Sequence, residues 1–404
     1  MLNVLTPDEV FELISRVFSS AEKSIEYIGI SEALHRTLGE DIRAAEYVPS
    51  FNRSTVDGYA LKASDSFGCS ESIPAILELA GRVDMGITPS FTLKDGQCAY
   101  VPTGGEIPDG ADCVVMIEYS EDFNDGTIGI SKPGAPGLNV IFKGDDVCPG
   151  KVILEKGRIL TPSDIGALAA NGTVSVPVCA KTRVGIISTG DELVDASEVP
   201  QGAQIRDVNT PLLSTLFEEN GAETVVYGIV SDDRALLEEK MEEAVSHCDM
   251  VVISGGSSVG VKDSAAEIIE SMGQLLFHGI AMKPGKPTML GKCSGKPVFG
   301  LPGHPVAAYF AARLFALYAL DTLEGKRRNK YTVRAYLSEN LGANDGRANY
   351  IGVRCTSEDG RLIASPIRTK SGLITSLAGS DGYICIERDC EGLPRGAEVE
   401  ISVF

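Results

Sequence analysis

The sequence predicts a multidomain protein in which one α/β domain is combined with domains built of β-strands. Two observations lead to this fold class. Between residues 180 and 328, apolar strands alternate with helical segments, which is typical of a mostly parallel sheet covered on both faces. Residues 46–146 and the chain from 329 onward are instead rich in Gly and Pro, with short apolar runs and no long helical pattern. A length of 404 residues is enough for roughly two to four domains.

The first 24 residues are predicted to form an amphipathic helix. Thr6 is suited to the N-cap, Pro7 to the first helical position and Glu9 to the closing position of a capping box. Because this stretch has acids within its apolar pattern and no basic leader, we expect a helix of the fold and not a signal peptide. A second short helix is expected at residues 31–42.

Residues 147–179 are expected to form a strand and then a short helix, which Thr161 and Pro162 would open and Asn171 would close. In the α/β region we expect strands at 183–189, 222–230, 249–254, 275–282 and 297–301, and helices at 209–221, 232–248, 263–273 and 304–323. Strand segments are expected in the C-terminal β region at 331–340, 349–369, 381–389 and 397–404.

Composition and charge exclude several classes of function. A net charge of −20 disfavours nucleic acid and anionic membranes as partners, because phosphate binding needs a broad basic face. No apolar run is expected to approach the roughly 20 residues of a membrane-spanning helix. The ten cysteines form no CxxC pair and there are only four histidines, so a zinc site is not expected. Scattered free thiols suit the reducing cytoplasm.

One segment departs from the acidic background. Residues 271–320 contain no Asp or Glu, although 56 acids among 404 residues would place roughly seven in a window of that size. Pro and Gly stiffen part of it, KPGKPTMLGKCSGKP, so that ammonium groups are held in place at low entropic cost. A positive site in so acidic a protein indicates an anionic ligand, with a solvated surface loop as the alternative. The cations of the window are Lys283, Lys286, Lys292, Lys296 and Arg313.

A glycine turn lies just upstream, in the segment SGGSSVGVKD at 254–263. Glycines after a parallel strand let the backbone approach a ligand, and the helix that follows offers free N–H groups to an anion. The segment lacks the spacing of a dinucleotide fingerprint or a P-loop. It is therefore either an anion-binding turn at the carboxyl end of a strand or a plain strand-to-helix connection.

Other short motifs contain candidate functional residues. The motif GDEL places Glu192 at the end of a buried strand, where a carboxylate can bind Mg²⁺ or simply cap a helix. Asp57 in VDGY, Thr103 in PTGG and Asp146 in KGDD, each taken alone, favour a turn. His304 in LPGHP favours a helix cap or a packing role over a ligand contact.

The order of the motifs is much more specific than any one of them. From Asp57 to the C-terminus the chain contains VDGYA, PTGG with PDGAD, KGDD, LTPSDIGALAANG, STGDEL, SGGSSVG, AMKPGKP, LPGHPVA and SGLITSLAGSDGYI. In this order they resemble the molybdopterin molybdenumtransferase family, which includes MoeA and the E domain of gephyrin. The resemblance covers nearly the whole chain.

The resemblance implies an elongated homodimer whose subunits have four domains, two of them discontinuous. The active site would lie between the α/β domain of one subunit and the β-rich domain of the other. The α/β domain would have the doubly wound molybdopterin-binding fold, and the C-terminal domain would resemble a β-barrel. The domains expected on this basis are 1–24 with 180–328 (α/β), 25–45 with 147–179 (an elongated linker domain), 46–146 (β-rich) and 329–404 (C-terminal β).

The activity implied by the resemblance is insertion of molybdate or tungstate into adenylylated molybdopterin, with Mg²⁺-dependent release of AMP. The partners would be the small-molecule pterin, a second copy of the chain and, transiently, the molybdopterin adenylyltransferase. Two other functions use the same fold, the adenylyltransferase itself and a non-catalytic scaffold. The acids of VDGYA, KGDD and GDEL, together with the two β domains, favour the insertase. The choice between the oxyanions stays open, because they share charge and shape.

Matched motif by motif, the functional positions of the family fall on acids, lysines and the glycine turn of this chain. Two lysines on a stiff loop suit a dianion, and donors fixed around a diphosphate suit its cleavage. The resemblance assigns catalysis to Asp57, Thr103, Asp146 and Glu192. The three carboxylates of this set, those of Asp57, Asp146 and Glu192, are also the expected Mg²⁺ ligands. It assigns substrate binding to Asp232, Ser254, Gly255, Gly256, Ser257, Asp263, Lys283, Lys286 and Pro287.

Two positions depart from the family pattern. Where the family usually has LPGNPVS, this chain has His304 and Ala307, so an oxyanion contact expected from a serine hydroxyl is missing. Gly279 stands where family members often have a lysine. Neither departure removes the carboxylates or the KPGKP loop.

Overall fold

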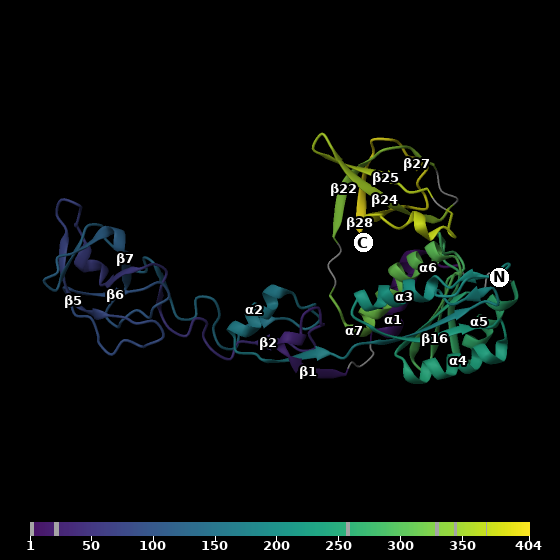
Figure 1. Cartoon of the computed structure of the whole chain (residues 1–404), viewed down its shortest axis with the longest axis horizontal. Coiled ribbons are helices and arrows are strands. Elements are labelled where there is room, and N and C mark those ends of the chain that lie inside the picture. The colour runs from purple at the N-terminus through teal and green to yellow at the C-terminus, as the bar shows by residue number, and fades with distance from the viewer. Residues whose placement is uncertain (1–3, 20–23, 256–258, 328–330, 343–345, 369) are drawn as a thin grey trace.

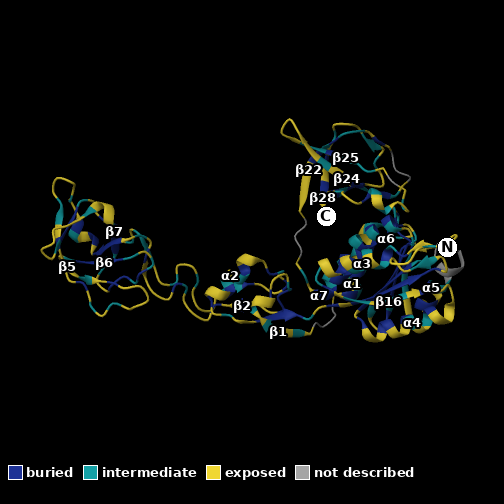
Figure 2. Ribbon diagram, in the orientation of Figure 1, coloured by how far each residue is buried: buried dark blue, intermediate teal, exposed yellow. Residues whose placement is uncertain are grey.

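The computed structural model describes residues 4–19, 24–255, 259–327, 331–342, 346–368 and 370–404. The chain is elongated (Figure 1). A β-rich domain occupies one end, a small domain lies in the middle, and an α/β domain and a C-terminal β domain adjoin at the other end. Each of these parts has its own buried core (Figure 2). The fold class predicted from the sequence is confirmed.

The α/β domain is built on a six-stranded sheet with the order β16-β13-β17-β21-β20-β18. The first four strands of this order are parallel and the last two are antiparallel, so the sheet is mostly parallel, as predicted. A separate short pair, β14 and β15, follows β13. The strands are β13 (Arg183–Thr189), β14 (Leu193–Val194), β15 (Ile205–Arg206), β16 (Glu223–Val230), β17 (Met250–Gly255), β18 (Gly273–His278), β20 (Met289–Cys293) and β21 (Lys296–Leu301).

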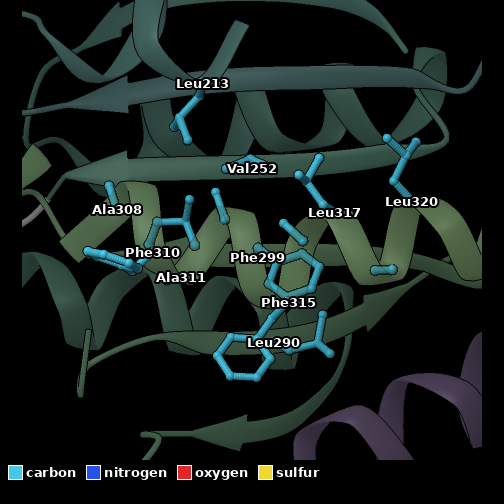
Figure 3. Close-up of a cluster of buried hydrophobic side chains, with 14 of the residues drawn as sticks. Leu213, Val252, Leu290, Phe299, Ala308, Phe310, Ala311, Phe315, Leu317 and Leu320 are labelled. Carbon is cyan, nitrogen blue, oxygen red and sulfur yellow. The ribbon is translucent and has the colours of Figure 1, made fainter. Parts of the chain in front are cut away.

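Side chains of the sheet alternate between two cores, as strand geometry requires. Val252 of β17 faces one core, and its neighbours Val251 and Ile253 face the other. In the first core, Val252 and Phe299 of the sheet pack against a long apolar helix (Figure 3). The helices are α1 (Pro7–Phe18), α3 (Asn209–Glu219), α4 (Arg234–His247), α5 (Val259–Met272), α6 (Pro305–Ala311) and α7 (Leu317–Glu324), and a π-helical turn at Ala312–Ala316 joins the last two.

The continuous helix from α6 to α7 is long and apolar. It spans Pro305–Glu324, 20 residues with a mean hydropathy of 1.4, and so has the length and composition of a membrane-spanning helix. The expectation that no apolar run approaches this length is wrong. Of its most apolar window, 67% is buried inside the domain, against α1, α3 and the sheet. A largely apolar helix is expected where most of its length is buried in the core of a domain.

Helix α1 packs on the α/β domain and has the predicted capping box. The Thr6 hydroxyl oxygen accepts the Glu9 N–H at 3.3 Å, and the Glu9 carboxylate accepts the Thr6 N–H at 2.7 Å. Val10, Ile14 and Phe18 are buried on one helix face, in the same core as α7. Helix α1 thus belongs to the α/β domain, although the other elements of that domain follow in the sequence only from β13 onward.

The helix of the small middle domain forms as predicted. It begins after Thr161, whose hydroxyl and N–H engage the carboxylate of Asp164 in a capping box, and it ends at Asn171. Two short antiparallel strand pairs complete this domain. Its elements are β1 (Ile25–Gly29), β2 (Ile42–Arg43), β11 (Val152–Leu154), α2 (Pro162–Ala170) and β12 (Ser175–Cys179).

The helix expected at residues 31–42 is wrong. Only a 3₁₀ turn forms there, at Ile30–Glu32. His35 takes the left-handed conformation (φ 63°), which ends helical geometry, and Leu38 pairs with Val178 in an isolated bridge. Contacts to segments distant in sequence therefore override the local helical pattern.

The β-rich domain contains a six-stranded sheet with the order β7-β4-β6-β5-β9-β8, and β3 pairs with β10 beside it. No α-helix occurs among its residues, all of which are described, in agreement with the prediction. The strands are β3 (Arg53–Ser54), β4 (Gly58–Leu61), β5 (Ala75–Arg82), β6 (Gln97–Val101), β7 (Cys113–Met116), β8 (Ser120–Asp122), β9 (Thr127–Ile130) and β10 (Val140–Ile141).

The C-terminal domain is a closed five-stranded barrel, because β24 pairs with both β25 and β26. A short strand from the α/β domain, β19 (Met282–Lys283), joins it by pairing in parallel with β24. The strands of the domain are β22 (Thr332–Leu337), β23 (Leu341–Gly342), β24 (Ala348–Glu358), β25 (Arg361–Pro366), β26 (Gly382–Ile386), β27 (Gly392–Leu393) and β28 (Glu398–Val403).

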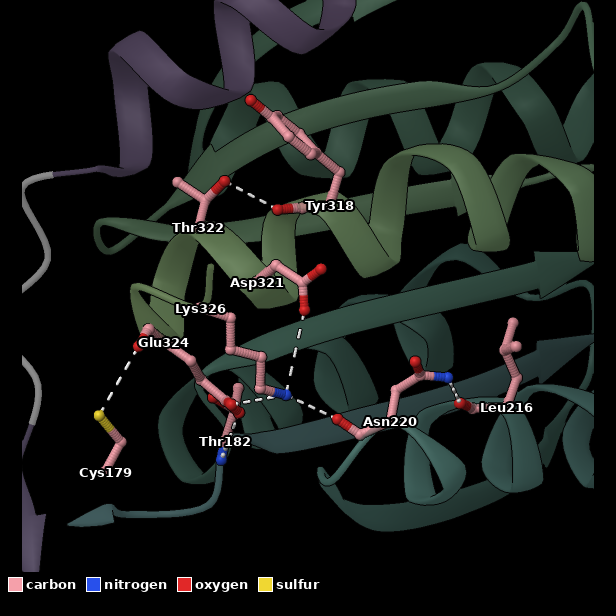
Figure 4. A network of polar contacts seen from close by, with 9 residues as sticks. All are labelled: Cys179, Thr182, Leu216, Asn220, Tyr318, Asp321, Thr322, Glu324 and Lys326. Atoms are coloured by element: carbon pink, nitrogen blue, oxygen red, sulfur yellow. Dashed lines mark hydrogen bonds and ion pairs between the residues drawn. The ribbon is translucent and has the colours of Figure 1, made fainter. Parts of the chain in front are cut away.

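A buried ion network lies at the end of α7 (Figure 4). The side chains of Lys326 and Glu324 are only 3% and 4% exposed, and their Nζ and Oε2 atoms are 2.7 Å apart. Lys326 also donates to the carbonyl of Asn220 after α3 (2.6 Å), and Glu324 accepts the N–H of Thr182, just before β13 (3.4 Å). The network thus joins the segment just before β13 to the end of α7, which are the first and last parts of the continuous α/β region.

Candidate functional site

A cavity of about 1150 Å³ lies between the α/β domain and the C-terminal domain. The α/β domain lines it with the KPGKP loop and the start of α6, and the C-terminal domain lines it with the start of β24 and the segment after β25. Among the described lining residues there is no Asp or Glu. Five cationic side chains line it: Lys283, Lys286, Arg347, Arg368 and Lys370.

The pairing of β19 with β24 brings these cations together. Lys283 lies opposite Asn349, and the Ala348 N–H donates to the carbonyl of Ala281 at 3.0 Å. The loop that follows is stiffened where Gly285 has a φ of 117°, a conformation that favours glycine. The Thr288 hydroxyl donates to the Gly285 carbonyl at 2.7 Å and closes this turn. The lysine loop is thus held by two domains at once.

Three of the cations have no partner within the described part of the chain. Lys283 and Lys286 are exposed and Arg347 is half-buried, and no hydrogen bond or ion pair joins their cationic groups to another described residue. Arg368 differs, because its guanidinium donates to the Glu339 carboxylate and to the Asn340 carbonyl, both at 2.8 Å. Unpaired like charges facing one cavity repel each other, so an anion that binds there is stabilised.

A histidine, a serine, a buried tyrosine and an alanine also line the cavity. The Nδ1 atom of His304 lies 2.9 Å from the hydroxyl oxygen of Ser371. Tyr350 is buried, and burial raises the pKa of its phenol, so it remains a neutral group. Ala307 presents only a methyl group to the cavity.

Not all cations of the acid-free window belong to this site. Lys292 and Lys296 lie at the far end of the β20–β21 hairpin, where Cys293 pairs with Lys296, and neither lines the cavity. The Lys296 ammonium instead donates to the carbonyl of Val245 at 2.6 Å. Arg313 stacks over the ring of Phe404, 4.9 Å from its centroid. The four lysines of the window therefore do not form one cluster, because strand geometry separates Lys292 and Lys296 from Lys283 and Lys286.

The described part of the glycine turn packs against the cavity wall. The Ser254 hydroxyl is buried and accepts the Asn209 side-chain N–H at 2.6 Å, and the same amide nitrogen donates to the carbonyl of Gly303 at 2.9 Å. Gly255 has a φ of 142°, and a Cβ there would lie 2.1 Å from the carbonyl oxygen of Thr189. A Cβ on Gly303 would lie 3.6 Å from the Cα of Gly255, so the two turns touch.

Part of the predicted turn cannot be placed. Gly256 and Ser257 lie outside the described residues. Asp263 lies in α5, which begins at Val259 and therefore earlier than expected, and its side chain is also outside the description. Pro287 lines the cavity next to Lys286.

An acidic cluster lies at the carboxyl ends of β13 and β16. The Asp191 carboxylate accepts the Asp232 N–H at 3.0 Å. Burial raises the pKa of the Asp232 carboxyl above its usual range, and the charges of Asp191 and Glu192 raise it further. A second cavity of about 800 Å³ opens here, lined by Asp191, Asp207 and Thr210 among others. Its acidic lining suits hydrogen-bond donors and cations.

The remaining predicted residues belong to the β-rich end of the molecule. The Asp57 carboxylate, just before β4, accepts the Thr103 N–H at 2.8 Å. Asp146 lies where the chain returns from this domain, with its N–H bonded to the carbonyl of Val48 at 3.1 Å. Figure 1 places β5, β6 and β7 far from the α/β domain. Within one chain, Asp57 therefore lies next to Thr103 but far from Glu192.

The predicted Mg²⁺ ligands can be tested against this geometry. Asp57, Asp146 and Glu192 are not gathered in one chain, and the described residues contain no group of three or more His, Cys, Asp or Glu arranged to hold a metal ion. Burial raises the pKa of the Asp232 carboxyl and the charges of Asp191 and Glu192 raise it further, so a hard cation beside these carboxylates would relieve their repulsion. Oxygen ligands from elsewhere would be needed to complete a site.

The residues that the C-terminal domain contributes to the cavity were missed in the sequence. Arg347 and Ser371 are 61 or more residues beyond Lys286; Arg347 lies in no motif that the sequence analysis named, and Ser371 begins the SGLITSLAGSDGYI motif but was not singled out as a site residue. Only the pairing of the two-residue strand β19 with β24 reveals that they share a cavity with the lysine loop.

Three family models match consecutive parts of the chain. The MoeA N-terminal region (domain I and II) matches residues 5–172, the model described as "Probable molybdopterin binding domain" matches residues 185–322, and the MoeA C-terminal region (domain IV) matches residues 334–404.

Relatives match along nearly the whole length. The chain is 32% identical over 408 residues to the molybdopterin molybdenumtransferase of Bacillus subtilis, covering 99% of this chain and 95% of the relative. It is 33% identical over 383 residues to the molybdopterin molybdenumtransferase of Haemophilus influenzae, covering 94% of each. Among solved structures, the molybdopterin biosynthesis moeA protein of Pyrococcus horikoshii OT3 is similar at 34% identity, with a TM-score of 0.88 over 100% of both chains.

Proposed function

Because the chain belongs to the MoeA family of molybdopterin molybdenumtransferases, a family of molybdenum cofactor biosynthesis, we propose that it inserts molybdenum from an oxyanion into adenylylated molybdopterin and releases AMP. The proposal has three parts: an oxyanion site, a pterin site beside it, and a second subunit that completes the reaction centre.

The observation that carries the proposal is the cationic cavity between the α/β and C-terminal domains. Lys283, Lys286 and Arg347 face it without partners in the described part of a chain whose net charge is −20. A dianion such as molybdate would gain charge-assisted hydrogen bonds from these groups. Because the β19–β24 pairing holds the two walls in place, little ordering is required when the anion binds.

We propose that the pterin binds next to this cavity, along the carboxyl ends of the parallel strands. Ligands of open α/β sheets bind at such ends. The turn at Ser254 and Gly255 touches the turn at Gly303, so a substrate on the glycine turn would lie beside the oxyanion. The carboxylate of Asp232 would accept hydrogen bonds from the amino and ring N–H groups of a pterin.

The β-rich domain requires a second subunit. Asp57, Thr103 and Asp146 lie at the opposite end of the elongated chain from the cavity. We propose a homodimer in which the β-rich domain of one subunit covers the α/β domain of the other. The Asp57 carboxylate, oriented by the Thr103 N–H, would then position water for attack on the diphosphate.

Magnesium would be held by Asp57, Asp146 and Glu192 together with oxygens of the substrate diphosphate, and it would neutralise the charge that develops on the leaving phosphate. The backbone N–H groups of Gly104 and Gly105 donate to the carbonyls of Ser54 and Pro102, both at 2.8 Å, so the Thr103 hydroxyl is the donor that this loop would offer to the diphosphate. All ten cysteines are free, which supports a reducing cytoplasm as the place of action. There the molybdopterin adenylyltransferase would deliver its product through a transient contact.

The decisive experiment follows AMP release from adenylylated molybdopterin with purified protein, Mg²⁺ and either molybdate or tungstate. We expect AMP release that depends on oxyanion and on Mg²⁺, with metal recovered in the pterin product. No stimulation by either oxyanion would contradict the proposal. A parallel reaction with molybdopterin and ATP serves as control, because an adenylyltransferase would form adenylylated pterin there and the insertase would not.

A further inference from the structure

His304 lies in the cationic cavity, at the start of α6. Its backbone occupies the N-cap position, but its side chain makes no capping hydrogen bond to the helix. The imidazole lines the cavity instead, with Nδ1 2.9 Å from the Ser371 hydroxyl oxygen. The Val306 N–H of the same helix turn donates to the Ser371 carbonyl at 3.0 Å. His304 and Ser371 are therefore held together across the boundary between two domains.

The hydrogen bond between His304 and Ser371 leaves at least one N–H or O–H donor of the two side chains unused. In the neutral pair, either Ser371 donates to Nδ1 and Nε2 carries the ring proton, or Nδ1 donates to Ser371 and the serine proton is available. When the imidazole is protonated, both ring nitrogens donate and a positive charge is added. The number of free donors and the charge thus rise together as the ring gains a proton.

The other titratable side chains of the cavity are lysines, arginines and a tyrosine, residue types whose ordinary pKa values lie well above neutrality. Burial raises the pKa of the Tyr350 phenol further. Histidine is the residue type that changes charge between about pH 5 and 8. His304 is the histidine among the described lining residues, whose other titratable members are Lys283, Lys286, Arg347, Tyr350, Arg368 and Lys370.

We propose that His304 is a proton-linked ligand for the oxyanion, and that with Ser371 it supplies the hydrogen-bond donors that Ala307 at the same helix start lacks. This inference rests on the proposed function of the cavity and deepens it. The protonated imidazole binds a dianion more strongly than the neutral ring does. By linkage, the bound anion favours protonation, so oxyanion affinity rises as the pH falls.

Calorimetric titration of the full-length protein with sodium molybdate, in the absence of pterin, tests this. Titrations between about pH 6 and 8, in two buffers of different ionisation enthalpy, give both affinity and proton uptake. We expect affinity to rise about five-fold or more across this range, with net proton uptake on binding. In His304→Asn, which keeps a donor but does not titrate, the pH dependence and the proton uptake should disappear.

A matched control is available in the same chain. The Nδ1 atom of His247, at the end of α4, lies 2.9 Å from the Ser246 hydroxyl, so it forms the same kind of pair far from the cavity. His247→Asn should leave the pH dependence unchanged. Ser371→Ala should weaken binding at every pH and retain proton uptake, because the imidazole remains. His304→Gln provides a second non-titrating variant in case Asn alters the helix start.

The outcomes separate the two proposals. If the wild-type protein binds neither molybdate nor tungstate at any pH, the proposed function of the cavity fails. If it binds them and His304→Asn and His304→Gln show the same pH dependence and proton uptake as wild type, the cavity function stands and the role of His304 is overturned.

Discussion

Replacing Lys326 with Met removes the charge of the buried network at the end of α7 and keeps an apolar stem of similar length. In the native chain the Lys326 ammonium lies 2.7 Å from the Glu324 carboxylate, 2.6 Å from the Asn220 carbonyl and 4.0 Å from the Asp321 carboxylate. The substitution leaves the Glu324 carboxylate, whose side chain is 4% exposed, without its cation.

The expected cost follows from this burial. Removing one partner of a buried ion pair costs about 3–5 kcal/mol, because the other charge stays in a low dielectric. An exposed pair of the same 2.7 Å length, Lys240 with Glu243, has side chains that are 39% and 45% exposed. Lys240→Met should cost only about 0.3–0.5 kcal/mol. In the double variant Lys326→Met/Glu324→Gln no buried charge from the pair remains, so most of the loss should be regained.

Urea unfolding followed by far-ultraviolet circular dichroism measures these differences, since the chain contains no Trp for fluorescence. The reasoning is refuted if Lys326→Met loses no more stability than Lys240→Met. If the double variant is as unstable as the single one, the loss comes from altered packing and not from an unpaired charge. Because the network joins the entry and exit of the α/β domain, we also expect Lys326→Met to unfold this domain before the C-terminal barrel.

Three further outcomes are expected. Lys283→Ala should raise the molybdate concentration for half-maximal AMP release by about tenfold or more. It should leave the urea unfolding midpoint unchanged, because the Lys283 side chain is exposed and unpaired. An unchanged molybdate requirement would contradict a role for Lys283 in oxyanion binding. Asp57→Asn should lower kcat by about 100-fold or more at unchanged stability, since Asn still accepts the Thr103 N–H, and initial rates beside urea midpoints measure both. Asp232→Asn should stabilise the protein at neutral pH, because the raised pKa of Asp232 means that the folded state carries its charged form at a cost. That cost is present above the folded pKa and is lost as the pH falls below the ordinary carboxyl value, so the stabilities of the two proteins should converge on acidification.

The sequence predicts an element correctly where the contacts that form it lie between residues close together in the chain. The capping box at Thr6 and the helix start at Thr161 form as predicted, because each depends on residues no more than three positions apart. The helix expected at residues 31–42 fails, because its backbone pairs with strands more than 100 residues away, as Leu38 does with Val178. No periodic pattern in a short segment encodes such a partner.

The candidate site likewise combines residues that the sequence identifies locally with residues that only the fold brings together. The lysine loop was predicted from its own residues, whereas Arg347 was missed and Ser371 was noted only as part of a motif, because it is the β19–β24 pairing that brings the C-terminal domain to the lysine loop. Strand β19 has only two residues, so it exists because of its partner and not because of an intrinsic preference. A site built on such a contact is visible only once the fold is known.

The acid-free window has two physical causes, and only one of them is a ligand. Most of residues 289–320 form buried strands and the core helix, and carboxylates are excluded there because their desolvation would be costly. Acids are absent around Lys283 and Lys286 for a different reason, since these side chains are exposed and an acid beside them would neutralise the cavity. The window therefore indicates an anion site only where its cations are both exposed and unpaired. The lysine loop meets this condition, whereas Lys296 and Arg313 are engaged in contacts that hold the fold.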